Sequence, residues 1–224
     1  MNLFRSERLR AFAAAALLSL PGLALAADTA KPSPQVVEIR DRWAEVNYNT
    51  PKAQRAAAFE ALAKRSEALR KEHPKDPGAL IWDGIVLSSW AGERGGLGAL
   101  GLVKQARKNF EESIAIDPAA LDGAAYTSLG ALYYQVPGWP VGFGDDKKAR
   151  ELLRKGLAVN PGGIDANYFQ ADFLRGQEDW KGAVAALQKA LAAAPRPGRE
   201  LADSGRRKEA EALLSQVRPH LASH

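Results

Sequence analysis

The sequence predicts an all-α protein in which helix hairpins stack into a right-handed α-solenoid that ends in a C-terminal capping helix. A spacing of small and large apolar residues recurs along the chain, and alanine is abundant while runs of β-branched residues are scarce. No segment alternates apolar and polar residues as a half-buried strand would. The 224 residues are 46% hydrophobic and 25% charged, which is typical of a globular protein and argues against a disordered chain.

The first residues have the pattern of a cleavable signal peptide. Three arginines precede an apolar stretch over residues 11–20, and Ala24-Leu25-Ala26 supplies the small residues that a signal peptidase requires. Because a transmembrane helix needs about 20 apolar residues, no membrane span is expected in the mature chain. We therefore expect residues 1–26 to be a signal peptide, residues 27–34 to be flexible, and the mature chain to be periplasmic. An amphipathic or buried N-terminal helix is the alternative.

One repeat domain is expected over residues 35–221. Its first helix pair is degenerate: an apolar stripe begins at Val36, and a second helix follows Pro51 and ends near Pro74. A charged helix follows Pro197-Gly198 and is expected to cover the last repeat. Helix pairs are predicted over residues of about 35–73, 78–118, 120–161 and 163–195, with a terminal helix over about 200–219.

The middle of the chain repeats the signature of a second helix. A small residue is followed by a large apolar residue four positions on, another small residue three further on, and a proline five after that. The three sets are Ala106, Phe110, Ser113 and Pro118; Ala149, Leu153, Gly156 and Pro161; and Ala183, Leu187, Ala190 and Pro195. Tyr126, Leu129, Gly130 and Tyr133 match the first-helix template. These spacings are typical of the tetratricopeptide repeat, whose small residues permit close helix approach.

Two repeats depart from the template in length. The first-helix small residue and the second-helix alanine are 12 positions apart in the third repeat, but 19 apart in the second and 22 in the first. We therefore expect inserts in two consecutive turns, over residues 92–98 and 136–145. Inserts in repeat arrays often form the binding face, so we expect the two to be neighbours along one edge. The alternative is that both fold back and cover that edge.

Six residues are candidates for contact with a partner or ligand. Tyr134, Trp139 and Phe143 lie in or beside the second insert, outside the positions that the template uses for packing. The other three candidates are Trp90, Asp172 and Phe169. Aromatic residues at helical spacing are usually core, and aspartates within apolar helices, such as Asp83 and Asp172, usually form a hydrogen bond in a groove between helices.

Four segments together resemble a known family. They are Tyr126-Thr127-Ser128-Leu129-Gly130, residues 136–145, Asn167-Tyr168-Phe169 and residues 197–207. The chain is similar, over about residues 35–218, to the periplasmic tetratricopeptide T component of tripartite ATP-independent periplasmic (TRAP-type) transporters. The resemblance implies a protein that partners a solute-binding protein and holds an apolar ligand in a pore.

Other chemistries find little support. Gly96-x-Gly98-x-x-Gly101 fits the dinucleotide-binding pattern but lacks the strand that this site requires. With no cysteine and three peripheral histidines, we expect no metal, cofactor or catalytic site, and hence no enzyme. The net charge of +5 is scattered, which argues against nucleic acid. The sequence favours a protein-binding adaptor or scaffold in TRAP-type uptake, and the alternative is a carrier of an apolar small molecule.

Overall fold

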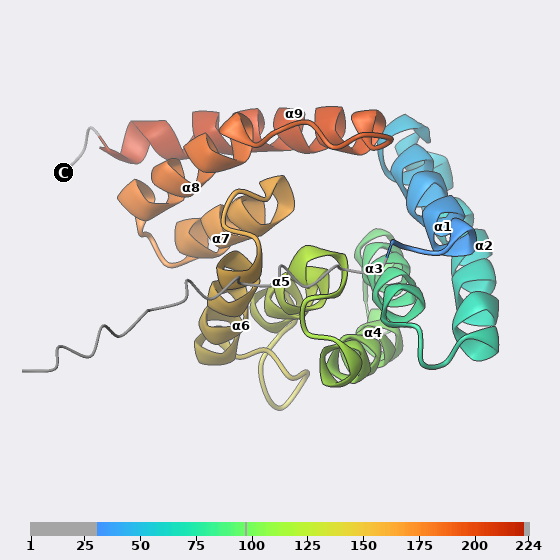
Figure 1. Cartoon of the computed structure of the whole chain (residues 1–224). Coiled ribbons are helices and arrows are strands. Elements are labelled where there is room, and N and C mark those ends of the chain that lie inside the picture. The colour runs from blue at the N-terminus through green and yellow to red at the C-terminus, as the bar shows by residue number, and fades with distance from the viewer. Residues whose placement is uncertain (1–30, 97, 222–224) are drawn as a thin grey trace, which may run out of the picture.

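The computed structural model describes residues 31–96 and 98–221, and in these two ranges every regular element is a helix (Figure 1). The predicted signal peptide lies outside the described residues. The elements are α1 (Pro34–Ala44), the π-helix η1 (Glu45–Asn49), α2 (Lys52–Glu72), α3 (Pro77–Arg94), α4 (Gly98–Ile116), α5 (Ala120–Gln135), α6 (Asp146–Val159), α7 (Ile164–Gly176), α8 (Trp180–Ala192), α9 (Glu200–Val217) and the 3-10 helix η2 (Arg218–Leu221).

Neighbouring helices pack as hairpins, and the hairpins stack side by side. The pairs α3–α4, α5–α6 and α7–α8 make the most extensive contacts, while α1, α3, α5 and α7 also touch one another in series. The odd-numbered helices therefore form an inner layer and the even-numbered helices an outer layer, which confirms the predicted α-solenoid.

Side chains from the sequence mark where the helices begin. Asp145 accepts a hydrogen bond from the backbone N–H of Lys148 at 3.0 Å, and Asp179 does the same for Gly182 at 2.9 Å. Such caps satisfy amide groups that have no partner within the helix. Asp145 thus begins α6 as an N-cap.

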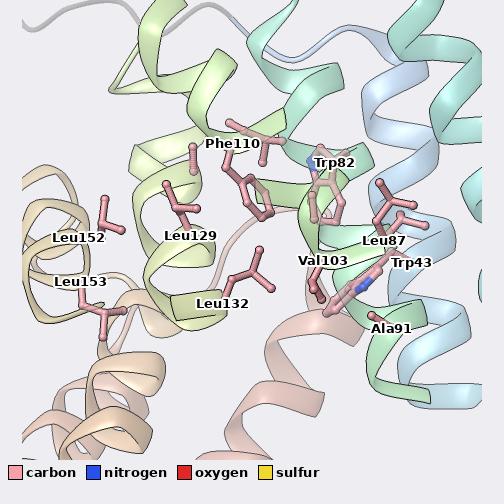
Figure 2. Close-up of a cluster of buried hydrophobic side chains, with 14 of the residues drawn as sticks. Trp43, Trp82, Leu87, Ala91, Val103, Phe110, Leu129, Leu132, Leu152 and Leu153 are labelled. Carbon is pink, nitrogen blue, oxygen red and sulfur yellow. The ribbon is translucent and has the colours of Figure 1, made fainter. Parts of the chain in front are cut away.

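Small residues of the inner helices lie against large residues of the outer helices. A Cβ atom built on Gly130 would lie 2.9 Å from Leu153 Cγ, and one on Gly84 would lie 2.5 Å from the Phe110 ring. Figure 2 shows Phe110 and Leu153 inside the buried cluster that these contacts support. The repeat spacing is therefore a packing requirement, because any side chain at either glycine would collide with the facing helix.

One carboxylate is buried in this core, and side chains of two neighbouring helices donate hydrogen bonds to it. Asp83 is 1% exposed and accepts hydrogen bonds from Ser66 Oγ at 2.6 Å, Arg70 Nε at 2.8 Å and Asn109 Nδ2 at 2.7 Å. These partners lie on α2 and α4, so Asp83 links three helices. Asp83 therefore accepts hydrogen bonds in a groove between helices, as the sequence indicated.

The first predicted insert is not a loop. Helices α3 and α4 have 18 and 19 residues, against 13 each in α7 and α8, so most of the extra residues lengthen the helices. The turn between them contains Gly95 and Gly96 with φ of 64° and 62°, a conformation that favours glycine. The prediction of a loop insert over residues 92–98 was therefore wrong, because α3 continues through Gly92 to Arg94 and α4 begins at Gly98.

The C-terminal helix joins the two ends of the solenoid. The segment between α8 and α9 crosses to α1, where Arg40 Nη2 donates a 3.1 Å hydrogen bond to Gly198 O, and α9 then runs back across α7 and α8 (Figure 1). Tyr48 of η1 donates a 3.4 Å hydrogen bond to Glu209 Oε2, and its ring lies against Gly205. Helix α9 therefore does more than cap the last repeat, because it closes the stack into a ring.

Candidate functional site

A cavity of about 550 Å³ lies at the centre of this ring. Its described lining comes from α1, η1, α3, α5, α7, α9 and the adjoining loops, with no residue from α2, α4, α6 or α8. The cavity is thus the concave inner face of the solenoid, covered by α9. Its volume lies within the range of about 300–1,000 Å³ that is usual for small-molecule sites.

One wall of the cavity is aromatic. The ring centroids of Trp43 and Trp82 are 5.9 Å apart, and Tyr48 packs edge-on against Trp43 at 5.8 Å. The Trp43 indole N–H donates a 2.8 Å hydrogen bond to Ser89 Oγ, which holds that ring in one orientation. Figure 2 shows Trp43 and Trp82 among the buried side chains, near Leu87 and Val103. This wall offers a rigid apolar surface to a ligand.

The facing wall is charged, and most of its charges are paired with one another. The Asp165 carboxylate accepts 2.8 Å hydrogen bonds from Arg196 Nη1 and from Arg206 Nε. Arg196 also contacts Asp203 at 2.6 Å, and Arg206 contacts Glu209 at 2.6 Å. Burial alone would raise the pKa of Asp165, but the nearby arginines hold that pKa well below its usual range, so Asp165 stays ionised.

Arg199 differs from the other arginines of this wall because no carboxylate of the described residues forms an ion pair with it. Its guanidinium lies 5.8 Å from the centroid of the Trp82 ring, and its Nε is buried with no hydrogen-bond partner among the described residues. Arg196 Nη2 also lacks a hydrogen bond, but it lies 2.6 Å from the Asp203 carboxylate. Burial lowers the pKa of Arg199, and the positive charges of Arg196 and Arg40 lower it further. An unpaired buried donor is costly, and Arg199 lines the cavity, so its guanidinium is the charged group of this wall that is left to bind an acceptor.

A strained piece of backbone also borders the cavity. Leu121 and Asp122, at the start of α5, have φ of 47° and 58°, and both line the cavity. Left-handed φ values are uncommon for residues with a Cβ, and residues with them occur often at ligand-binding positions. The strain at Leu121 and Asp122 therefore adds to the case that this cavity is a functional site.

The stacked hairpins resemble those of solved protein structures. The chain matches no protein-family model and is similar in sequence to no curated protein. TTC0263, a thermophilic TPR protein of Thermus thermophilus, superposes with a TM-score of 0.51 and 23% identity over 81% of this chain and 91% of its own. The fold is that of a tetratricopeptide-repeat protein. MamA from Desulfovibrio magneticus RS-1 has a TM-score of 0.43 and 18% identity, over 86% of this chain and 98% of its own.

Two of the six candidate residues form a pair in the tetratricopeptide stack, away from the cavity lining. The Tyr134 hydroxyl donates a 2.8 Å hydrogen bond to Asp172 Oδ2, and Arg175 Nη2 contacts the other oxygen of Asp172 at 2.7 Å. Burial and the Asp172 carboxylate raise the pKa of Tyr134, so the hydroxyl stays protonated and keeps donating. The pair joins α5 to α7, as a groove hydrogen bond would.

The second insert is a loop, and its two aromatic residues differ. The Phe143 ring packs against Tyr133, with a centroid distance of 5.4 Å, and lies 5.0 Å from the Arg107 guanidinium of α4. Trp139 is 90% exposed at the tip of the loop, and Val141 is also exposed. The loop therefore folds back onto the outer layer through Phe143, while Trp139 projects into solvent.

The last two candidates, Phe169 and Trp90, lie in different parts of the structure. Phe169 lines the central cavity, and its ring lies 4.8 Å from the Arg206 guanidinium. Trp90 packs against the core on α3, with the Arg94 guanidinium 5.7 Å from its ring. The six predicted positions thus do not meet at one site, and Phe169 alone among them lines the cavity.

The sequence interpretation missed the cavity arginines. It treated the charged C-terminal helix as a polar cover, so Arg196, Arg199 and Arg206 were not considered. A signal was present, because Asp203 and Arg206 fall in the same helical stripe as Ala202 and the other buried residues of α9. Charged residues on the apolar face of a helix are seldom buried unless they are paired or bind something.

Among the described residues there is no group of three or more histidine, cysteine or acidic side chains that could hold a metal. No helix within residues 31–96 and 98–221 is long and apolar enough to cross a membrane.

Proposed function

We propose that this protein is a carrier that holds one small molecule in the cavity at the centre of its ring. The closure of the solenoid by α9 is the observation that supports this function most directly. It turns the concave face into a cavity of about 550 Å³ with an aromatic wall and a charged wall. A few convergent polar groups on an otherwise apolar surface are typical of small-molecule sites.

Filling the cavity tests this proposal. Ser128 is a partly exposed residue of α5 that lines the cavity, so Ser128→Trp places a large side chain in the space for the ligand. Native mass spectrometry of the purified protein should show a bound small molecule in the parent and in a Ser128→Ala control, but not in Ser128→Trp. A ligand retained equally by a folded Ser128→Trp variant would place the binding site elsewhere.

A second candidate function is protein docking, as expected of an adaptor or scaffold. Trp139 at 90% exposure and Val141 at 55% form an apolar tip on the loop between α5 and α6. Exposed tryptophan is enriched among the residues that dominate binding energy at protein interfaces. We propose that this tip contacts a protein partner, and that a periplasmic solute-binding protein is that partner.

We further propose that the chain is exported to the periplasm and serves TRAP-type solute uptake. The pattern of residues 1–26 supports export, and the family resemblance supports the transport role. Export is tested by the mass of the protein in a periplasmic extract, which should begin at or near Ala27. A mass that includes Met1 would contradict it.

The transport role is tested by ligand transfer. A solute-binding protein encoded beside this chain should take up the cavity ligand faster in the presence of the parent than in the presence of Trp139→Ala. Equal transfer with both proteins would contradict a role for the loop tip, and no transfer with either would contradict the association with uptake.

A further inference from the structure

We infer that the ligand of the central cavity is an organic anion, with its carboxylate bound by Arg199 and its apolar part packed against Trp43 and Trp82. This inference rests on the proposed small-molecule function and specifies the class of molecule. It comes from the way in which the charges of the cavity wall are paired.

The lining carries an excess of positive charge. Among the described residues that border the cavity, the charged ones are four arginines and two aspartates. They are Arg40, Arg196, Arg199, Arg206, Asp122 and Asp165. Asp41, Asp203 and Glu209 lie outside the lining and pair with three of these arginines, so the charge that a ligand meets depends on which arginine has no carboxylate.

Three of the four arginines have protein partners. Arg196 and Arg206 share Asp165 at 2.8 Å each, and each has a second carboxylate of its own on α9. Arg40 contacts Asp41 at 2.7 Å and donates to Gly198 O at 3.1 Å. These guanidinium groups hold α9, α7 and α1 together, and their roles are structural.

Arg199 is the fourth, and within the described part of the chain no carboxylate forms an ion pair with it. Its Nε is buried without a hydrogen-bond partner among those residues. The charge of Asp165 acts to raise the pKa of Arg199, but both oxygens of that carboxylate already accept hydrogen bonds from Arg196 and Arg206. A guanidinium presents parallel N–H groups that match the two oxygens of a carboxylate.

The position of Arg199 also explains why the anion should have an apolar part. Its guanidinium lies 5.8 Å from the centroid of the Trp82 ring, and Trp82 lies 5.9 Å from Trp43. A carboxylate bound to Arg199 would therefore have its carbon skeleton directed along the aromatic wall. Inorganic phosphate or sulfate would satisfy the charge and leave that wall uncovered.

Matched probes test the inference. Decanoate and decanamide have the same chain and differ in the charge of the head group, and their dissociation constants can be compared by calorimetry at neutral pH. We expect the parent to bind decanoate at least tenfold more tightly than decanamide. Arg199→Gln should bring the two constants together by weakening decanoate binding while leaving decanamide binding unchanged.

Two further variants serve as controls. Lys208→Gln removes the same charge from an exposed position of α9 outside the cavity lining, and should keep the full preference for decanoate. Arg199→Lys keeps the charge but cannot form two parallel hydrogen bonds, so it should keep part of the preference. It also preserves the test in case Arg199→Gln does not fold.

Each contrary result has a distinct meaning. Equal binding of both probes by the parent would overturn the anion inference and leave the small-molecule function standing. A preference for decanoate that survives in Arg199→Gln would overturn the role of Arg199. Binding of neither probe by the parent would count against the small-molecule function itself, and the inference would fall with it.

Discussion

Gly205 of α9 and the ring of Tyr48 in η1 are in such close contact that a Cβ atom on Gly205 would overlap the ring. The two residues are far apart in the sequence, and their contact is part of the closure between the C-terminal helix and the first helix pair. The cavity depends on this closure, because α9 supplies Ala202 and Arg206 to its wall.

Gly205→Leu should therefore loosen the ring. Overpacking at a tight contact typically costs about 1–3 kcal/mol, so the free energy of unfolding should fall by that amount. Chemical denaturation of the variant measures the loss. Ser204→Leu, at an exposed position one residue away, is the control and should change stability little. Equal stability of the two variants would show that α9 does not close on η1.

Gly130→Leu should also destabilise the protein, through the stack and not through the ring. A Cβ atom there would lie 3.1 Å from the backbone nitrogen of Leu153, which cannot move without shifting α6. We expect a loss of about 1–3 kcal/mol in a thermal or urea melt. Gly101→Leu is the matched control, since a Cβ at this exposed helical glycine meets nothing within 4 Å. A melt of Gly130→Leu that equals the parent's would contradict the repeat register.

The two aromatics of the second loop should respond differently to truncation. Trp139→Ala should change the free energy of unfolding by no more than about 0.5 kcal/mol, because the side chain is 90% exposed. Phe143→Ala should cost more, since its ring packs against Tyr133 and the Arg107 guanidinium. Thermal melts of the two single variants decide the matter, and a large drop for Trp139→Ala would mean that the loop tip is structural.

Asp165 should make stability depend on pH in the acid range. Its pKa is held below the ordinary value of 3.8, so the folded state keeps the carboxylate ionised where the unfolded state binds a proton. The stabilisation is fully present above that ordinary value and is lost as the pH falls below it. Urea denaturation at pH 6 and pH 3 should therefore show a smaller acid-induced loss for Asp165→Asn than for the parent. An equal loss would mean that other carboxylates account for it.

The hairpins could be predicted from the sequence because their determinants are local. The close packing of Gly130 against Leu153 follows from the spacing of the repeat template. Asp145 begins its helix by accepting a hydrogen bond from an amide three residues away. The number of extra residues in an insert did not predict whether the insert is a loop or a longer helix. Counting residues between Gly84 and Ala106 cannot distinguish a loop from two longer helices, and the structure shows the longer helices.

The site was hard to predict for a different physical reason. Its walls meet only after the ring closes, so Trp82 and Arg199 become neighbours through tertiary structure and not through any spacing along the chain. The charges of α9 indicated a solvated surface, while in the structure Arg206 binds Asp165 of α7 and Asp203 binds Arg196 in the segment before α9. Only the helical stripe that Arg206 and Asp203 share with Ala202 could have shown that they are buried.

Closure also limits how this architecture can change in length. An open solenoid tolerates the gain or loss of a repeat, because each repeat contacts only its neighbours. Here the segment before α9 reaches back to Arg40, and Glu209 of α9 reaches back to Tyr48, so a duplicated hairpin would separate both pairs. The contacts between the first helix pair and the C-terminal helix therefore fix the number of hairpins. Proteins built on this plan should vary in their loops while the number of hairpins stays constant.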